Sequence, residues 1–460
     1  MHHSTATAPE DRLDFKRVLP VFLIVFVDLM GLTVTIPFIT YYAASFGADA
    51  VLIGLLQMAY PLMQFIGAPI LGDLSQKYGR KPILIISQIG TFIGFIMLAF
   101  ANSLWILFLA RIIDGFTGGN ISTAQAALTD ITTPRTRTQA MGLIGAAFGL
   151  GFVLGPAISG IALSASNSDY RIPSLIAAGF SLLALTLTQF VFHETLPPEK
   201  RGASTDAVEQ PSRLRRMIHA AQHPAVGILL ILIFTQQLIF GGFERVISLF
   251  LLSRLGMSAS NNAIIFLLVG IIAVLVQGVF IGSWSRRLGE RKLIFAGMAL
   301  LGAGLLLMAF TPAQAVNWYD RNQLITELTD PEGTASIDLT TFQLPSEDNK
   351  GWAGIGWLLV SLVPIAVGGS VLQPSINSLV TKRVDPIEVG AILGISAAFL
   401  SAANTLAPLI SGVIFQFGGE TAPFLLGGGS MIVLLFFALR RLVPNPRDNL
   451  AKEAMASAAP

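Results

Sequence analysis

Long apolar runs recur from one end of the sequence to the other, and they constrain the fold more than any other feature. Only 12% of the 460 residues are charged, whereas 53% are hydrophobic and the mean hydropathy is +0.69. A helix of about 20 apolar residues is long enough to cross the hydrocarbon core of a bilayer. The composition therefore excludes a soluble globular protein, a disordered protein and a secreted soluble protein.

The apolar runs predict helices, because they are too long and too continuously apolar for the alternating strands of a membrane barrel. Twelve spans are expected, at residues 18–43, 52–72, 82–101, 104–127, 139–164, 172–193, 224–252, 262–282, 292–311, 353–379, 387–416 and 421–442. We therefore predict an all-α integral membrane protein in a lipid bilayer. The even number of spans places both termini on the same side.

The distribution of Lys and Arg predicts which side that is. Of the 29 Lys and Arg residues, 23 lie in the two termini and in every second loop. The opposite face carries four, which are Arg171, Arg254, Arg321 and Lys350. Because positive loop residues stay on the cytoplasmic side of a membrane, we expect both termini to be cytoplasmic. The expected location is the cell (inner) membrane, as a multi-pass protein.

An internal repeat relates the two halves of the sequence. The stretch "GDLSQKYGRK" from Gly72 matches "GSWSRRLGERK" from Gly282, at an offset of 210 residues. Further along, "GLIGAAFGLGFVLGPAISG" from Gly142 matches "GISAAFLSAANTLAPLISG" from Gly394, at an offset of 252. The second match aligns Pro156 with Pro408 and Gly160 with Gly412. The repeat predicts two six-helix bundles related by pseudo-symmetry, with a substrate path at their interface.

The polar segments divide the chain accordingly. We predict an N-terminal six-helix bundle at residues 1–193, a cytoplasmic linker at 194–223, a C-terminal six-helix bundle at 224–442 and a cytoplasmic tail at 443–460. The outer loop at 312–352, which holds seven acidic and two basic residues, accounts for the larger offset of the second match.

Five ionisable residues lie inside the predicted spans, namely Asp28, Arg111, Asp114, Glu244 and Arg245. Each costs roughly 2.5–3.5 kcal/mol at the bilayer centre, so we expect them to face the bundle interior or water. Asp28, Arg111, Asp114 and Glu244 are the predicted proton-coupling residues, because a carboxylate in a cavity can bind a proton and a cationic substrate in turn. Two alternatives stay open: Arg111 and Asp114 neutralise one another as structure, and Arg245 snorkels or pairs locally.

Polar residues at helical spacing predict a substrate cavity. The predicted substrate-binding residues are Gln57, Tyr60, Gln64, Gln237, Gln373, Asn377 and Asn404, with Phe148 and Phe399 from the repeat-related fifth and eleventh spans. For each of them the alternative is interhelical hydrogen bonding or packing.

The sequence gives no sign of an enzyme. It contains no cysteine, no metal-spaced histidines and no phosphate-binding loop with its lysine. We expect no cofactor, no bound metal and no nucleic-acid partner. The expected partners are the bilayer, protons and a small-molecule substrate, and we expect a monomer.

Four stretches resemble the major facilitator superfamily, and within it the drug:proton antiporter branch that includes the tetracycline exporters. They are "VDLMGLTVTIPF" in the first span, the "GDLSQKYGRK" loop, "ARIIDGFTGG" in the fourth span and "GLGFVLGPAISG" in the fifth. The resemblance implies the twelve-helix major facilitator fold. It also implies that Asp28 binds substrate or a proton, and that Arg111 takes part in proton transfer.

The loop and fifth-span motifs imply a set of gating residues, which are Asp73, Gln76, Arg80, Lys81, Asp130, Gly149, Gly155 and Pro156. The loop departs from the family pattern at Gln76, where the family usually has an aspartate that latches the cytoplasmic side. We expect Asp73, one helical turn earlier, to replace it by capping the eleventh span, while Arg80 pairs with Asp130.

The function predicted from these features is a secondary active transporter. Our first hypothesis is a proton-coupled antiporter that exports small amphipathic compounds, of the multidrug or tetracycline kind, by alternating access. The alternative is a proton symporter or facilitator that takes up a specific metabolite such as a sugar or an organic acid.

Overall fold

The computed structural model describes residues 14–133, 136–202, 227–329, 342–384 and 389–442. Within these ranges it contains twelve helices that are long and apolar enough to cross a membrane, the number that the sequence predicts. Most of the predicted linker, part of the outer loop and the whole tail at 443–460 lie outside the described residues.

Six spans make up the N-terminal half: α1 (Phe15–Thr35), α3 (Ala50–Tyr78), α4 (Arg80–Ala99), α5 (Leu104–Thr117) with α6 (Asn120–Ile131), α7 (Arg137–Ala165) and α8 (Arg171–Phe190). Six make up the C-terminal half: α10 (Gly227–Leu255), α11 (Ala259–Leu275) continuing through η2 (Val276–Phe280) into α12 (Ile281–Leu288), α13 (Glu290–Ala309), α15 (Ala353–Arg383), α16 (Val389–Gly418) and α17 (Ala422–Arg441). Three shorter helices are α2 (Ile39–Ser45), η1 (Pro198–Lys200) and α14 (Arg321–Glu327).

Two of the predicted spans are interrupted, which hydropathy alone does not reveal. The predicted span 18–43 breaks between α1 and α2 beside Pro37, which has no N–H to continue the helical ladder. The predicted span 104–127 breaks at Gly118 and Gly119. A Cβ on Gly119 would lie 2.7 Å from the Cα of Ala68, so the pair of glycines lets the chain turn directly against α3.

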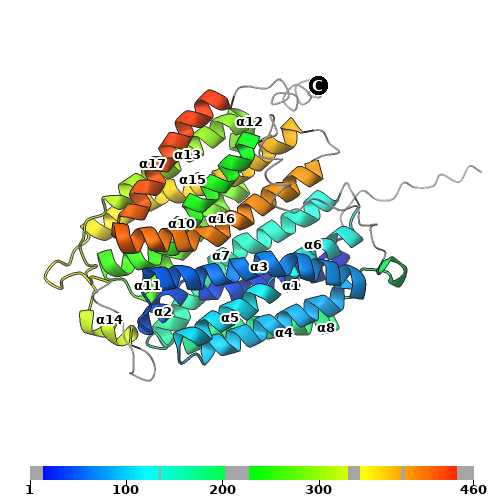
Figure 1. Cartoon of the computed structure of the whole chain (residues 1–460), viewed down its shortest axis with the longest axis horizontal. Helices are drawn as coiled ribbons and strands as arrows, with labels where there is room; N and C mark the ends of the chain where they lie inside the picture. The colour runs from blue at the N-terminus through cyan, green and yellow to red at the C-terminus, as the bar shows by residue number, and fades with distance from the viewer. Residues whose placement is uncertain (1–13, 134–135, 203–226, 330–341, 385–388, 443–460) are drawn as a thin grey trace, which may run out of the picture.

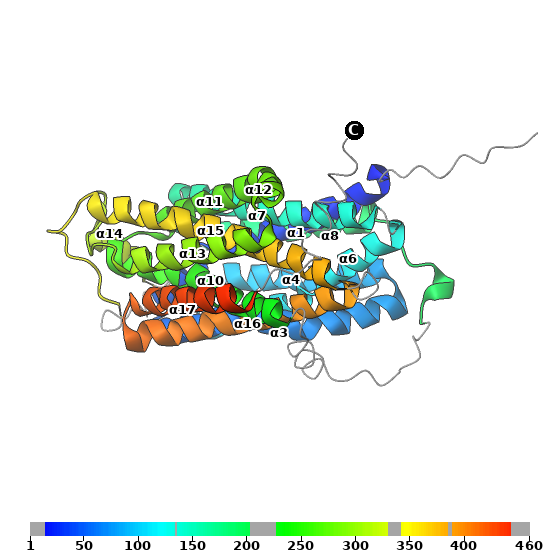
Figure 2. The same ribbon diagram turned by 90° about the horizontal axis from the view of Figure 1, so that it is seen from above.

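The two halves lie side by side and converge at one end. In Figure 1 the spans of the N-terminal half form the lower group and most spans of the C-terminal half form the upper group, whereas the short α14 lies at the lower left; the two groups separate toward the right. We call the end that carries α14 the loop end. The opposite end, where α8 and α17 end, is the linker end. Figure 2 shows that most helices run along the axis between these two ends.

The repeat seen in the sequence is also present in the packing. The halves meet where α3 packs on α16 and where α7 packs on α11. Gly412 of α16 lies against the Ala50 carbonyl of α3, and its repeat equivalent Gly160 of α7 lies against Ala263 of α11. The two contacts are related by the pseudo-symmetry of the two bundles.

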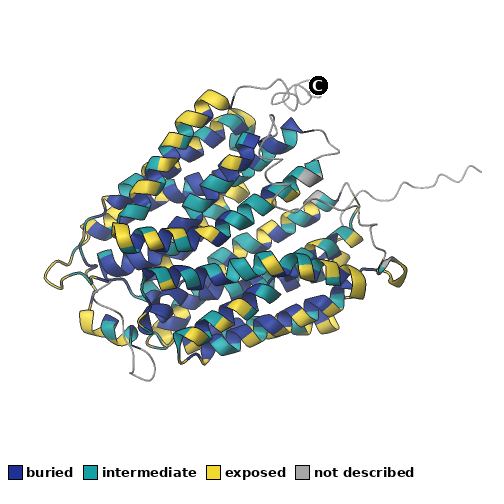
Figure 3. Ribbon diagram, in the orientation of Figure 1, coloured by how far each residue is buried: buried dark blue, intermediate teal, exposed yellow. Residues whose placement is uncertain are grey.

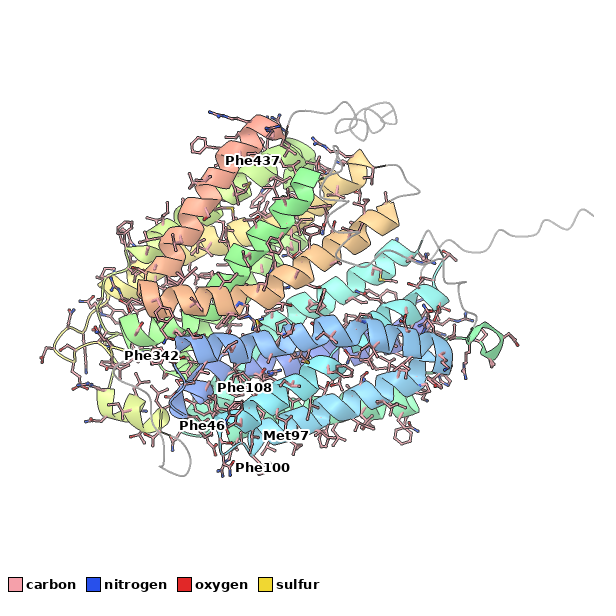
Figure 4. The ribbon with its side chains drawn as sticks, viewed as in Figure 1. Phe46, Met97, Phe100, Phe108, Phe342 and Phe437 are labelled. Atoms are coloured by element: carbon pink, nitrogen blue, oxygen red, sulfur yellow. The ribbon has the colours of Figure 1, made fainter. Side chains whose placement is uncertain are left out.

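The loop end is closed by apolar packing and hydrogen bonds between the halves. One hydrophobic core joins buried residues of α2, α3, α10 and α11. Phe46, Met97 and Phe108, which Figure 4 places at this end of the N-terminal half, pack against that core, and Phe342 is part of it.

Three hydrogen-bonding side chains strengthen the same closure. The Tyr41 hydroxyl donates to the Met257 carbonyl at 3.0 Å, and Asn262 Nδ2 donates to the Pro37 carbonyl at 2.6 Å. Gln416 of α16 accepts from the Val51 N–H at 2.9 Å. The structure therefore represents a conformation whose loop end is shut.

Candidate proton and substrate site

Arg111 and Asp114 form an ion pair on one face of α5. They are three residues apart, which places them on the same side of a helix, and the Arg111 guanidinium donates to Oδ2 of Asp114. The same guanidinium donates to Thr35 Oγ1 at 3.2 Å and lies 5.0 Å from the centroid of the Tyr60 ring. Both charged side chains are buried. The pairing that the sequence left open is present, and it lies directly against a predicted substrate-binding residue.

Asp28 of α1 lies apart from this pair and has no basic partner among the described residues. Its Oδ2 accepts from Asn120 Nδ2 at 2.8 Å. Its Oδ1 and the Asn120 Oδ1 are both buried without a hydrogen-bond partner among the described residues. Because buried polar atoms in folded proteins are almost always satisfied, these two oxygens mark a place for water or a ligand atom.

Asn120 is a site residue that sequence reasoning missed. It is the first residue of α6, directly after the break at Gly118 and Gly119. The break turns α6 so that Asn120 faces Asp28. The available signal was an amide side chain that follows two glycines inside an apolar span.

Tyr60 of α3 lies between the charged groups of the two halves. A glycine at Gly115 allows the close approach of α5, because a Cβ there would lie 2.5 Å from the Tyr60 carbonyl oxygen. Gln64, one turn further along α3, donates to the Tyr60 hydroxyl at 3.3 Å and to the Gly118 carbonyl at 2.9 Å. The charged groups within electrostatic range of the Tyr60 hydroxyl are Asp28, Arg111, Asp114 and Arg245.

Arg245 of α10 brings a charge of the C-terminal half to the same region. Its guanidinium is within electrostatic range of Arg111 and Tyr60, and its carbonyl accepts from Gln57 Nε2 at 3.4 Å. The side chain therefore lies near the interface between the halves, in line with the expectation that it faces the bundle interior; its electrostatic partner Glu244 fits the local-pairing alternative better than snorkelling. Glu244 is the next residue on α10 and the acidic neighbour of Arg245, and it makes no hydrogen bond within the described chain.

The C-terminal half contributes a neutral polar pair. Gln237 Nε2 of α10 donates to Asn404 Oδ1 of α16 at 2.8 Å. Gly241 lies beside this pair: a Cβ at its position would be 3.5 Å from Asn404 Oδ1 and 3.5 Å from Gln237 Nε2, which is ordinary contact. Phe399 of α16 packs edge-on against Phe234 of α10, with ring centroids 6.3 Å apart.

Three predicted substrate-binding residues are not brought into this group by any contact. Gln373 and Asn377 of α15 are half-buried and make no hydrogen bond within the described chain. Phe148 of α7 packs against the hydrophobic cluster of the N-terminal half. For Phe148 the packing alternative fits the structure better than a ligand contact.

The fifth-span motif acts through close helix packing. A Cβ on Gly155 would lie 2.1 Å from Thr33 Oγ1, so α7 crosses α1 with its backbone in contact. Gly149 faces the other half, where the nearest atom to its Cβ position is Val274 Cγ2 at 3.4 Å. Pro156 lies within α7, which stays helical from Arg137 to Ala165.

The loop motif at the linker end holds helices of one half together. Arg80 Nε donates to Asp130 Oδ2 at 3.0 Å, the pair that the sequence analysis expects, and Arg80 also donates to Ser75 Oγ at 2.6 Å. Asp73 and Gln76 have exposed side chains, and Asp73 makes no hydrogen bond or ion pair within the described chain. Asp73 caps no described residue of α16, and residues 385–388, directly before α16, lie outside the described residues. The helices α3 and α16 meet near the loop end and diverge toward the linker end (Figure 1).

A glutamate from the start of the linker completes this motif, and sequence reasoning missed it. Glu194 accepts from the backbone N–H of Arg80 at 2.9 Å and of Lys81 at 3.1 Å, so it caps the N-terminus of α4. Lys81 Nζ in turn donates to the Gln189 carbonyl at the end of α8 at 2.8 Å.

The C-terminal half carries the repeat equivalent of the Arg80 pair with its charges exchanged. Glu290 replaces Arg80 at the offset of 210, and Lys382 replaces Asp130 at the offset of 252. Lys382 Nζ donates to Glu290 Oε1 at 2.5 Å, and Ser285, the equivalent of Ser75, donates to the same oxygen at 2.9 Å. The two clusters join the same pair of spans in each half.

Comparison with known proteins agrees with this architecture. The Major Facilitator Superfamily matches residues 21–320 and 342–459. The chain is 26% identical to the class E tetracycline resistance protein of Escherichia coli over 93% of the chain and 96% of that protein. It is 28% identical to the class C protein of Escherichia coli, over 84% of the chain and 86% of the relative. Multidrug resistance protein 2 of Bacillus subtilis is 23% identical, over 89% of the chain and 91% of that protein.

Solved structures share the fold at lower sequence identity. The human organic anion transporter MFSD10 has a TM-score of 0.64 at 21% identity, covering 93% of this chain and 99% of that one. The nucleoside transporter NupG has a TM-score of 0.69 at 15% identity, covering 93% of this chain and all of that one. With the match to the family along nearly its whole length, the chain belongs to the Major Facilitator Superfamily and is a membrane transporter.

Proposed function

We propose that the protein is a proton-coupled antiporter that exports small amphipathic compounds by alternating access of the interface between its two halves. The names of its relatives, tetracycline and multidrug resistance proteins, support export of drug-like compounds. Uptake of a metabolite such as a sugar has no comparable support.

The observation that carries the proposal is the arrangement around Asp28. Arg111 neutralises Asp114, whereas Asp28 is bonded only to the neutral amide of Asn120 and keeps one oxygen without a partner among the described residues. A carboxylate inside a membrane span is stabilised by a proton or by a cation. Asp28 can bind either a proton or a cationic substrate but not both at once, and antiport requires this mutual exclusion.

The other charged groups of the site lie close enough to Asp28 to affect the exchange of proton and substrate. Tyr60 is within electrostatic range of Asp28, of the Arg111 pair and of Arg245. A substrate that displaces the proton of Asp28 therefore meets charged groups of both halves at once. We assign proton coupling to Asp28 and to the pair formed by Arg111 and Asp114, and substrate contact to Tyr60, Gln57, Gln64, Gln237 and Asn404.

We also propose that the linker end faces the cytoplasm, because it carries most of the Lys and Arg residues. The protein lacks native cysteine, so single cysteines report sidedness directly. A membrane-impermeant maleimide added to intact cells should label Lys350→Cys, and it should label Arg286→Cys only after permeabilisation. The opposite labelling pattern would reverse the assignment.

Transport by reconstituted protein tests the function. Proteoliposomes under an imposed pH gradient should release protons when tetracycline or a cationic dye is added, and the flux should be lost in Asp28→Asn. Asp348→Asn, which removes an exposed carboxylate of the outer loop, is the matched control and should leave the flux unchanged. Gradient-driven flux that persists in Asp28→Asn removes Asp28 from the mechanism, and proton movement in the same direction as the substrate favours the symporter.

A further inference from the structure

A cavity at the linker end lies on the outside of the N-terminal half, away from Asp28 and Arg111. It has a volume of about 500 Å³ and lies where α4 begins and where the chain returns after α8. The residues that line it are Lys81, Pro82, Ile85, Ile86, Glu194 and Arg201. The proposed transport mechanism uses none of this surface for substrate or protons.

The cavity has two basic side chains and one carboxylate whose oxygens are already occupied. Glu194 Oε1 accepts from the N–H of Arg80 and of Leu196, and Oε2 accepts from the N–H of Lys81. The Arg201 guanidinium lies 3.8 Å from Glu194 Oε2 and donates to the Leu196 carbonyl through Nε.

The two cations therefore have donors to spare. Lys81 uses one of its three ammonium protons on the Gln189 carbonyl. Arg201 has five N–H donors, and within the part of the chain that the structure describes its terminal nitrogens make only the long contact with Glu194. An anionic group with several oxygens, such as a phosphate, matches this set.

An apolar stripe leads away from the cavity along α4. Pro82, Ile86, Ile89 and Ile93 are exposed and follow steps of three or four residues, which places them on one face of the helix. Figure 3 shows exposed residues along the outer side of α4, on the face turned away from the other half. In a membrane this face contacts acyl chains.

The length of the stripe fits one leaflet. The eleven-residue step from Pro82 to Ile93 covers about 16 Å at 1.5 Å per residue, and one leaflet contributes about half of a hydrocarbon core of roughly 30 Å. An acyl chain that lies along Ile86 and Ile89 therefore places its headgroup next to Lys81 and Arg201.

We propose that this cavity binds the phosphate headgroup of an anionic phospholipid from the leaflet at the linker end. The phosphate is held by Lys81 and Arg201, and one acyl chain lies on the stripe of α4. The bound lipid joins the loop motif, through Lys81, to the start of the linker, through Arg201. Basic pockets between membrane helices are a recognised type of anionic lipid site.

Thermal stabilisation of the purified full-length protein tests this proposal. Short-chain phosphatidylglycerol should raise the melting temperature more than short-chain phosphatidylcholine at equal concentration. The double variant Lys81→Ala with Arg201→Gln should lose this difference, with binding weakened roughly fivefold for each basic residue removed. Arg440→Ala with Arg441→Ala, which removes two exposed charges from α17 at the same end, is the matched control and should keep it.

Two further measurements distinguish binding of a whole lipid from binding of a free phosphate group. Ile86→Asn should weaken phosphatidylglycerol binding, and soluble glycerol phosphate should give no stabilisation. If the double variant does not fold, Arg201→Gln alone, which leaves the Lys81 bond to α8, carries the test. The proposal is overturned if the wild type shows no preference for phosphatidylglycerol, if the α17 control loses as much as the cavity variant, or if glycerol phosphate stabilises equally.

Discussion

Replacing Gly412 with alanine should open the loop end of the transporter. Gly412 is where α16 crosses α3, and a Cβ there would lie 2.5 Å from the Ala50 carbonyl oxygen and 3.4 Å from the Gly54 Cα. Gly54 itself faces the Pro408 carbonyl of α16, at 2.7 Å from its Cβ position. The two helices therefore meet backbone to backbone, and neither partner atom belongs to a side chain that can rotate away.

The expected size of the effect follows from this geometry. Ordinary contact between heavy atoms needs roughly 3.5 Å, so an added methyl group requires α3 and α16 to part by roughly 1 Å. Overpacking of this kind costs about 1–3 kcal/mol. The cost falls on the conformation with the loop end shut, because the contact joins the two halves. Gly412→Ala should therefore shift the equilibrium toward the open loop end by roughly 5- to 150-fold.

Distances between spin labels measure this shift. Cysteines introduced at Trp105 and Trp352, which are exposed at the loop end of opposite halves, give one labelled pair in a protein without native cysteine. In Gly412→Ala the fraction of long distances should rise. Gly429→Ala, on α17 with no atom within 4 Å of its Cβ position, should match the parent. Unchanged distances in a folded Gly412→Ala protein would show that α3 and α16 do not limit closure.

Two further predictions concern charged groups at opposite ends. Burial raises the pKa of the Glu327 carboxyl, and Glu327 lies at a contact between the halves, where the hydroxyl of Tyr170, directly before α8, donates to its backbone carbonyl oxygen at 3.3 Å. Its protonated form is therefore favoured while the loop end is shut, and this stabilisation is lost as pH rises through the raised pKa. The label distances of the parent should respond to pH, and those of Glu327→Gln should respond less; an equal response would exclude Glu327. At the linker end, Glu290→Lys should lower the melting temperature by breaking the ion pair with Lys382. Adding Lys382→Glu should restore much of the lost melting temperature, because the pair forms again with its charges exchanged. No recovery in the double variant would show that this ion pair does not contribute to stability.

Hydropathy and charge count predict the depth of a residue in the bilayer but not the direction in which its side chain points. The twelve spans followed from apolar length alone, because a membrane requires each run to satisfy its own backbone. The same information placed Arg245 inside a span without indicating that it lies within electrostatic range of Arg111 in the other half. That proximity depends on how the two halves dock, which no local pattern records.

The internal repeat also predicts the second ion pair, between Glu290 and Lys382. The offsets of 210 and 252 residues place Glu290 on Arg80 and Lys382 on Asp130, so the second ion pair followed from the first. Asn120 and Glu194 were harder to foresee. Asn120 depends on a helix break that hydropathy does not see, and Glu194 reaches α4 only after the chain has passed through three further spans.

The contacts within each half and those between the halves would have different roles in the proposed alternating access. The ion pairs of Arg80 and Glu290 connect helices of one half, so they keep each half rigid while it moves and need not break. Among the described residues no ion pair joins the two halves at the loop end, which is instead closed by apolar packing, by the backbone contact of Gly412 and by hydrogen bonds such as that of the Tyr41 hydroxyl to a carbonyl. Such contacts exchange for water at little net cost, so the open and shut conformations can differ by a few kcal/mol. Under the proposed mechanism, a difference of this size is within reach of a single proton or substrate bound at Asp28.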